Sequence, residues 1–240
     1  QQSDGRFELD QWNPVYWKRF ERFLQAASQR EIIVQLVLWD PYDFYREAWK
    51  RNPFNPKNNL NYDQKAAKLP VSVPDHPAHF THPFFQSIPS QQNLLQVLPW
   101  QVKFVNKILS YSLNYNNILY CIDKQTPVNS QWGKYWAEHL QTKARQEGKK
   151  IHVTESWYPK NPSHPLHKES FYHPETYSYV DNSSNNYLKG DNHWEKGLEV
   201  SENLQKTGIL RPIHNMEVYG SNNIDSLSMD NALDNFCRNV

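Results

Sequence analysis

Short runs of apolar, β-branched residues alternate along this chain with longer amphipathic segments, and this alternation most constrains its fold. The clearest run is IIVQLVL at residues 32–38, which ends at Trp39 and Asp40. Continuous runs of this kind are typical of strands that are buried on both faces of a parallel sheet. We expect four further strands, at residues 118–122, 151–154, 177–180 and 213–218. Strands that alternate with helices predict an α/β fold with a parallel sheet.

The segments around these strands carry helical periodicity. An amphipathic helix is expected after Pro14, and further helices at residues 91–113, 130–147 and 193–206. Pro99 lies inside the second of these helices and predicts a kink there. A last helical pattern begins near residue 228 and still runs at Val240, so the chain is interpreted as a fragment.

Two long stretches rich in Pro and His, at roughly residues 41–90 and 158–176, follow the carboxyl ends of expected strands. Barrel enzymes build their sites from loops in this position, and no glycine-rich phosphate loop follows any strand. We therefore expect a (β/α)8 TIM barrel rather than a doubly wound sheet. The five strands make it a partial barrel, and residues 1–240 form one domain. Open sheet edges would leave such a piece with low stability on its own.

Charge and composition exclude several classes of function. Lys and Arg total 26 against 25 Asp and Glu, so binding of nucleic acid through bulk charge is not expected. The mean hydropathy of -0.86 predicts no membrane-spanning segment. Cys121 and Cys237 are too few for a disulfide framework and are interpreted as buried thiols. The ten histidines form no recognised metal motif, so neither a metal nor a cofactor is expected.

Polar and aromatic residues gather where the expected strands end. Carboxylates and amides bind sugar hydroxyls and aromatic rings stack on sugar faces, so this set predicts a carbohydrate site. Glycosidic cleavage also needs two carboxyl groups, one acting as the acid. The residues concerned are Trp39, Asp40, Asp123, Lys124, Gln125, Glu155, Trp157, Asp181, Glu217 and Tyr219.

Several of these residues also have a purely structural interpretation. Trp39 could plug the end of the barrel, and Asp40 and Asp181 could cap the turns that follow them. Glu155 could be a structural hydrogen-bond acceptor. Glu217 lies among apolar strand residues, where a carboxylate must be paired or functional.

The segments NILYCID, TESW and RPIHNMEVYG, in this order after a strand that ends in WD, resemble the clan A glycoside hydrolases. They are most similar to cellulase-like bacterial proteins with a (β/α)8 catalytic domain. The resemblance implies a retaining two-carboxylate mechanism on an oligosaccharide or polysaccharide, with Glu217 as the nucleophile. It also implies that the five strands are barrel strands three to seven, with the first two and the last missing. Members of the family are usually exported, which suggests a secreted or periplasmic location.

The acid/base position departs from the family pattern. The Asn-Glu pair expected there corresponds to Lys124 and Gln125. A Gln side chain cannot protonate a leaving group, and losing the general acid costs typically ~10²–10⁴-fold in rate. Asp123 or Glu155 would then have to serve as the acid/base. The resemblance implies substrate contacts for Trp39, Asp40, Lys124, Trp157, Asp181 and Tyr219.

Three functions therefore stay open on the sequence alone. The chain is a glycoside hydrolase with impaired activity, a carbohydrate-binding pseudoenzyme, or a module whose Asn- and His-rich loops bind a partner protein. An enzyme needs a second carboxylate about 5 Å from Glu217. A pseudoenzyme needs only an open cleft with aromatic rings.

Overall fold

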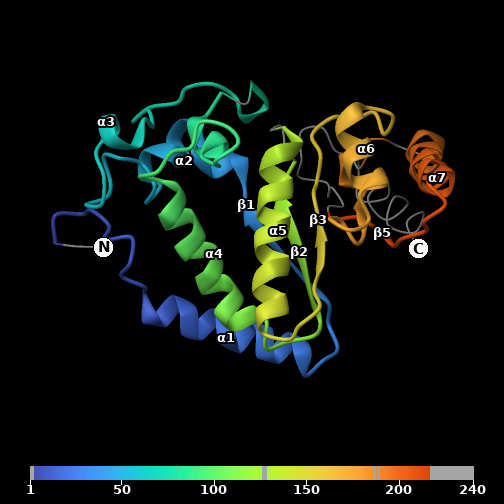
Figure 1. The fold of residues 1–240 in the computed structure, drawn as a ribbon, viewed down its shortest axis with the longest axis horizontal. Coiled ribbons are helices and arrows are strands. Elements are labelled where there is room, and N and C mark those ends of the chain that lie inside the picture. Colours follow the sequence, from blue (N-terminus) through green and yellow to red (C-terminus); the bar gives the residue numbers. More distant parts are fainter. Residues whose placement is uncertain (1–2, 80, 126–128, 186–187, 189, 217–240) are drawn as a thin grey trace.

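The computed structural model describes residues 3–79, 81–125, 129–185, 188 and 190–216. Helices and strands alternate along most of this length (Figure 1). In chain order the elements are α1 (Pro14–Ser28), β1 (Val34–Trp39), η1 (Pro41–Phe44), α2 (Arg46–Arg51), α3 (Gln64–Ala67), η2 (Pro77–His79), η3 (Pro83–Gln86), α4 (Leu98–Ser112), β2 (Ile118–Asp123), α5 (Ser130–Gln146), β3 (His152–Thr154), α6 (Pro165–Tyr172), β4 (Val180–Asp181), η4 (Ser183–Asn185), α7 (Gly190–Lys206) and β5 (Ile213–His214), where η marks a short 3₁₀ helix.

The strands of the described residues form two parallel sheets. One has the order β1-β2-β3, and the other pairs β4 with β5. Val34 lies opposite Ile118 in the first sheet, and Val180 lies opposite Ile213 in the second. The expected parallel pairing of strands that alternate with helices is therefore confirmed.

The expectation of a partial (β/α)8 barrel is wrong. The described strands form sheets of three and two strands, with no eight-stranded barrel and no single five-stranded sheet. In the described part of the strand expected at residues 213–218, Ile213 and His214 are the residues that pair. A backbone hydrogen bond from Ser178 N to Val153 O joins the two sheets. Alternation of strands and helices predicts that the strands run parallel. It does not indicate whether the sheet closes into a barrel.

Several element boundaries also differ from the expected ones. The helix expected from residue 91 begins only at Leu98, because Pro99 occupies its first turn, where the missing N–H costs nothing, instead of kinking its middle. Helix α6 lies inside the second Pro- and His-rich stretch, and the first stretch holds five short helices. Ile32 and Ile33, expected in the first strand, are exposed residues before it.

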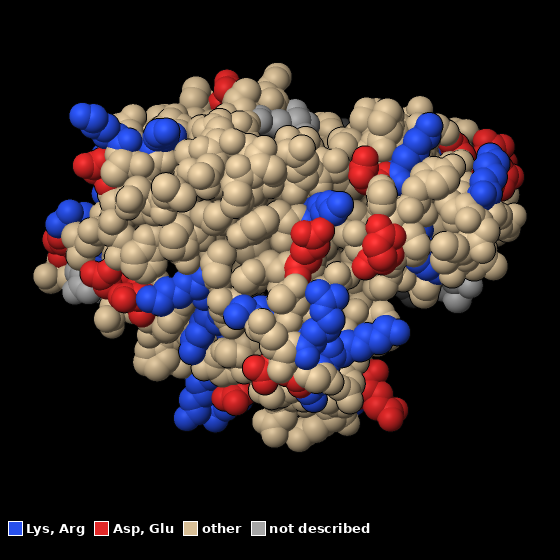
Figure 2. All heavy atoms as spheres, viewed as in Figure 1, with Lys and Arg blue, Asp and Glu red and all other residues tan. Residues whose placement is uncertain are grey.

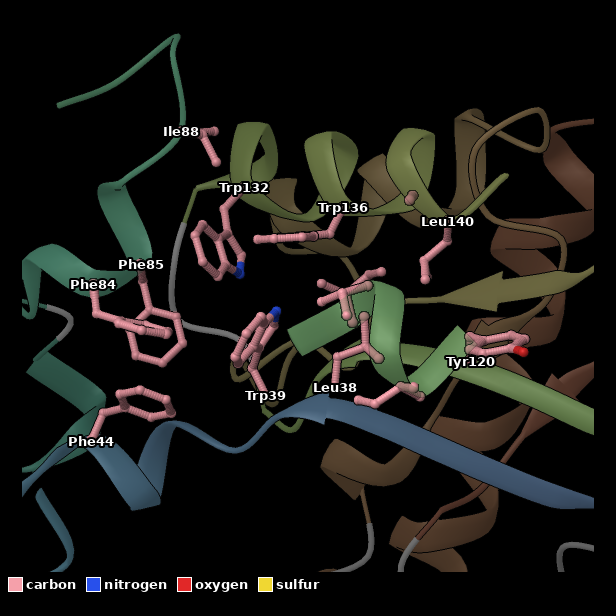
Figure 3. Close-up of a cluster of buried hydrophobic side chains, with 14 of the residues drawn as sticks. Leu38, Trp39, Phe44, Phe84, Phe85, Ile88, Tyr120, Trp132, Trp136 and Leu140 are labelled. Atoms are coloured by element: carbon pink, nitrogen blue, oxygen red, sulfur yellow. The ribbon is translucent and has the colours of Figure 1, made fainter. Parts of the chain in front are cut away.

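The main core lies between the three-stranded sheet and the helices α1, α4 and α5. Asn13 caps the N-terminus of α1, and the Asn129 side chain accepts from Gln131 N at the start of α5. Helix α5 buries Trp132, Trp136 and Leu140 at helical spacing, which places one apolar face on the sheet. Figure 3 shows Trp132 and Trp136 lying next to Trp39, with Phe85 beside Trp132, whereas Leu140 lies farther along the helix.

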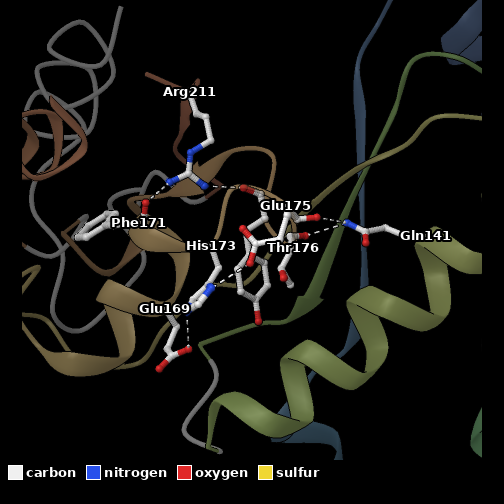
Figure 4. Close-up of polar contacts among 8 residues, drawn as sticks. Gln141, Glu169, Phe171, His173, Glu175, Thr176 and Arg211 are labelled. Atoms are coloured by element: carbon white, nitrogen blue, oxygen red, sulfur yellow. Dashed lines mark hydrogen bonds and ion pairs between the residues drawn. The ribbon is translucent and has the colours of Figure 1, made fainter. Parts of the chain in front are cut away.

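A second, smaller apolar cluster consists of Phe171, Val180, Val200 and Leu204 and joins α6, β4 and α7. Arg211 links the segment before β5 to α6 and to the segment before β4. Its guanidinium donates hydrogen bonds to the carbonyl oxygens of Phe171 and Tyr177 (Figure 4). On the surface, basic and acidic side chains are interspersed over the face drawn in Figure 2, in keeping with the balanced charge of the chain.

Candidate functional site

Three carboxylate side chains lie at the carboxyl ends of strands β2 and β3 of the first sheet and β4 of the second. Asp123 ends β2, Glu155 follows β3, and Asp181 ends β4. All three side chains are buried. The carboxyl ends of β2 and β3 lie at one edge of the first sheet, and the backbone bond from Ser178 to Val153 brings the chain before β4 next to β3. Ligands of α/β proteins bind at such strand ends. We call Asp123, Glu155 and Asp181 the carboxylate edge.

The charges of all three carboxylates act on the thiol of Cys121. Burial raises the pKa of Cys121 most, and the negative charges of Asp181, Glu155 and Asp123 raise it further. Its Sγ donates to the main-chain oxygen of Asp123 at 3.1 Å. The raised pKa keeps the thiol protonated at neutral pH.

Neighbouring side chains hold each carboxylate in place. Oδ2 of Asp123 accepts a 2.7 Å hydrogen bond from Nε1 of Trp132. Oδ2 of Asp181 accepts from Oγ of Ser183 at 2.7 Å, and Oδ1 accepts from Ser183 N. The carboxylate of Glu155 packs directly against the backbone of Gly133 in α5. Asp181 thus caps the following turn, as its structural interpretation predicts.

The hydroxyl of Tyr177 belongs to the same cluster. A Cβ atom at Gly133 would overlap the Glu155 carboxylate and come within 2.8 Å of this hydroxyl. Burial raises the pKa of Tyr177 most, and Glu155, Glu169 and Asp123 add to the shift. The phenol therefore stays protonated at neutral pH.

Lys124 and Gln125 continue β2 at the mouth of this edge and are both half-buried. The amide of Lys124 donates to the carbonyl oxygen of Trp39 at 3.0 Å, which fixes the backbone there. Gln125 has a φ of 52°, in the left-handed region that side chains other than glycine rarely occupy. Strained backbone of this kind is concentrated at functional sites.

Two further acidic residues lie on the same side of β1. The Oδ1 atom of Asp40 accepts from Tyr42 N and caps η1, as its structural interpretation predicts. Burial raises the pKa of Asp43 most, the charge of Asp40 raises it further, and the ammonium of Lys124 lowers it. Lys124 therefore lies within electrostatic reach of the loop that follows β1.

The two tryptophans predicted to contact substrate are buried. Trp39 packs against Phe44, Phe84, Phe104, Trp132 and Trp136 in the aromatic core of Figure 3. Trp157 donates from Nε1 to Oγ of Ser170. Both rings contribute to the packing under the carboxylate edge, and their contact with a sugar stays a prediction.

Glu217 and Tyr219, the predicted nucleophile and a predicted substrate-binding residue, lie outside the described residues. From the predicted set, Asp123, Glu155 and Asp181 lie at strand ends and act on Cys121, and Lys124 and Gln125 directly follow Asp123 in the chain. The sequence did not single out Gly133 or Tyr177, because their proximity to Glu155 depends on how α5 crosses the sheet.

A hollow beside α7, lined partly by Trp194, was not predicted either. The only signal for it in the sequence is a tryptophan on a helix that is otherwise rich in charged residues.

Among the described residues, no group of three or more His, Cys, Asp or Glu side chains is arranged to hold a metal ion. No helix in the described part of the chain combines the length and apolar character that a membrane crossing requires. Comparison with protein-family models, curated proteins and solved structures finds no match to this chain.

Proposed function

We propose that this chain is a glycoside hydrolase-like protein that binds an oligosaccharide or polysaccharide at the carboxylate edge. The observation that carries the proposal is that Asp123, Glu155 and Asp181 are buried at the carboxyl ends of β2, β3 and β4, where the charges of all three act on Cys121. Carboxylates accept hydrogen bonds from pairs of sugar hydroxyls, and a retaining mechanism needs two of them near the scissile bond. Glu217 takes the role of the nucleophile in this proposal.

Hydrolysis is expected to be slow because Gln125 occupies the acid/base position. Its amide can donate a hydrogen bond to the glycosidic oxygen but has no proton to transfer. Asp123 and Glu155 are the alternative acids, yet both are fully buried and packed against α5. This burial favours a second candidate function, a carbohydrate-binding pseudoenzyme. Such a protein retains sugar binding but has lost hydrolysis.

The leaving group of a synthetic substrate separates these two candidates. The dinitrophenolate leaving group departs without being protonated, whereas the phenolate of a phenyl glycoside needs protonation by a general acid. An impaired hydrolase should cleave dinitrophenyl glycosides slowly and phenyl glycosides hardly at all. Restoring the acid by combining Lys124→Asn with Gln125→Glu should raise the rate on phenyl glycosides by about 10²–10⁴-fold. The measurement is release of the phenol across a panel of glycosides.

Two control variants make the result specific. Lys124→Asn alone lacks the carboxylic acid and should stay at the wild-type rate. Glu217→Gln in the restored background should abolish release of the phenol. If the restored variant binds oligosaccharides but cleaves neither class, the pseudoenzyme is the correct function. If the wild-type protein binds no saccharide at all, the carbohydrate assignment is wrong.

A further inference from the structure

A hollow of about 260 Å³ lies between α7 and the β4-β5 sheet. Asn182 follows the carboxyl end of β4, and His214 and Asn215 lie at the corresponding end of β5. Helix α7 supplies Trp194, Gly197 and Ser201 to the opposite wall. Because Asn182 directly follows Asp181, the hollow begins where the carboxylate edge ends.

Trp194 is the one exposed tryptophan of this protein. All nine tryptophans lie in the described residues; six are buried and Trp12 and Trp100 are half-buried. Trp194 keeps 46% of its surface exposed. An indole offers a large flat apolar face with a single polar N–H, which suits a ligand that is apolar on one side and hydroxylated at its rim.

The rest of the lining combines the apolar side chains of Leu198 and Ile213 with polar groups that carry no permanent charge. None of the described residues around the hollow is Asp, Glu, Lys or Arg. Burial lowers the pKa of His214, so its imidazole is neutral at neutral pH. Amide, hydroxyl and neutral imidazole groups donate and accept hydrogen bonds without selecting a charged ligand. The lining therefore fits a neutral polyhydroxylated ring better than a phosphate, a carboxylate or a cation.

Gly197 keeps the wall of α7 open. A Cβ atom placed there would meet Asn182 Nδ2 at 3.9 Å and no other atom within 4 Å. Glycine inside a helix lowers stability by roughly 0.5–1 kcal/mol relative to alanine. At this position, it leaves room in front of Trp194, one turn of helix away.

We propose that this hollow is a subsite for a neutral pyranose ring, which stacks on Trp194 and hydrogen-bonds to Asn182, Ser201 and Asn215. The inference rests on the proposed function and extends it, since it names where a sugar unit lies beyond the carboxylate edge. Trp194 determines affinity in this subsite and takes no part in bond cleavage.

Iodide quenching of tryptophan fluorescence tests the subsite directly. In the full chain without ligand, iodide should quench a red-shifted component of the fluorescence emission that comes from Trp194. The Trp194→Phe variant should lack this component. Cellotetraose, xylotetraose and mannotetraose are then titrated, and at least one should protect this component. Trp194→Ala should weaken binding of that sugar roughly tenfold. The matched control is Trp100→Ala on α4, which should bind as the wild type does.

A second variant tests whether the hollow must be empty for the sugar to bind. Gly197→Leu improves helix propensity and fills the hollow with a side chain, so it should fold and yet lose the protection of Trp194. Circular dichroism and the melting temperature verify that it is folded.

The possible outcomes separate the subsite from the proposed function. Saccharide binding that neither protects Trp194 nor responds to Trp194→Ala overturns the subsite and leaves the proposed function standing. Absence of binding for all three sugars overturns both. If iodide does not reach Trp194 in the free protein, another part of the chain fills the hollow and the subsite is wrong.

Discussion

Gly133 and Gly197 both lie within long helices, but their surroundings differ. A Cβ at Gly133 would overlap the Glu155 carboxylate, whereas a Cβ at Gly197 makes only an ordinary contact. Glycine at position 133 is therefore required for the carboxylate edge to pack against α5. Glycine at position 197 is a cost to helix stability.

The two alanine variants should consequently move stability in opposite directions. Gly133→Ala forces Glu155 and Tyr177 to shift, and overpacking of this kind typically lowers the free energy of unfolding by about 1–3 kcal/mol. Gly197→Ala should raise it by roughly 0.5–1 kcal/mol. Urea unfolding followed by circular dichroism measures both values. Equal effects of the two substitutions would show that Glu155 does not pack on Gly133.

The identity of the strand-end residues could be predicted from the sequence, because each follows a run of apolar residues. Their partners could not. Asp123 bonds to Trp132 and Glu155 packs on Gly133 through contacts that depend on the path of α5 over the sheet. Trp39 illustrates the same limit: its sequence position suits both a sugar platform and a core residue, and only packing shows that the ring is buried.

At the scale of elements, η3 depends on a histidine that must stay neutral. Nδ1 of His82 accepts from Phe84 N and caps this short helix, while the ring packs against Trp49 and Phe44. Burial lowers the pKa of His82 from 6.5 to about 3. Between pH 6.5 and about 3, His82 is therefore neutral in the folded protein but protonated in the unfolded chain.

Stability should fall as the pH drops from 6.5 towards 3, and it should be unaffected by this group above 6.5. At pH 5, the loss from His82 alone is about 2 kcal/mol. His82→Asn retains a capping oxygen and cannot titrate, so its stability should depend less on pH. Urea unfolding at pH 7.5 and 5 for both proteins gives the comparison. An identical pH dependence would mean that His82 is protonated in the folded state.

Long periodic segments were the elements that the sequence predicted best. Helix α5 spans Ser130–Gln146, close to the expected residues 130–147, because its buried tryptophans recur at helical spacing. Helix α6 was missed inside a Pro- and His-rich stretch, although its Pro165 occupies a typical first-turn position. Strand β4 spans only Val180–Asp181, so the apolar pattern at residues 177–180 did not give its position or length.

At the scale of the whole molecule, the two apolar clusters differ greatly in size. The larger one joins α1, α4, α5 and the three-stranded sheet, whereas the smaller one holds four residues around α6, β4 and α7. Local opening follows the amount of buried apolar contact. Backbone amides of α6, α7 and β5 should therefore exchange with deuterium faster than those of α5 and β2.

Arg211 should stabilise the region around α6, β4 and α7 against local unfolding. Its two hydrogen bonds to the carbonyl oxygens of Tyr177 and Phe171 involve a charged donor, and such bonds contribute about 1.5–3 kcal/mol each. Arg211→Gln should raise exchange in α6 and β4 at least about tenfold and leave α5 unchanged. Arg145→Gln, which removes an exposed contact to Thr142, is the control and should alter neither. A uniform rise across all helices would show that the molecule opens as one unit.

The strand-helix alternation predicted the parallel pairing of this molecule but not the number of strands in each sheet. Ser178 to Val153 is the backbone bond that joins the two sheets, and no local pattern at either residue indicates where one sheet ends. Sheet closure depends on the pairing of distant strands, which the pattern of a single strand does not contain.

The main-chain bond from Lys124 to Trp39 has a consequence for how the mouth of the carboxylate edge can evolve. Because the main-chain amide of Lys124 makes this bond, the bond does not depend on which side chain stands at position 124. In the genetic code, a lysine codon becomes an asparagine codon by a change of its third base, and a glutamine codon becomes a glutamate codon by a change of its first. Two point mutations therefore separate the present pair from an Asn-Glu pair, so either pair can arise from the other through single-base changes.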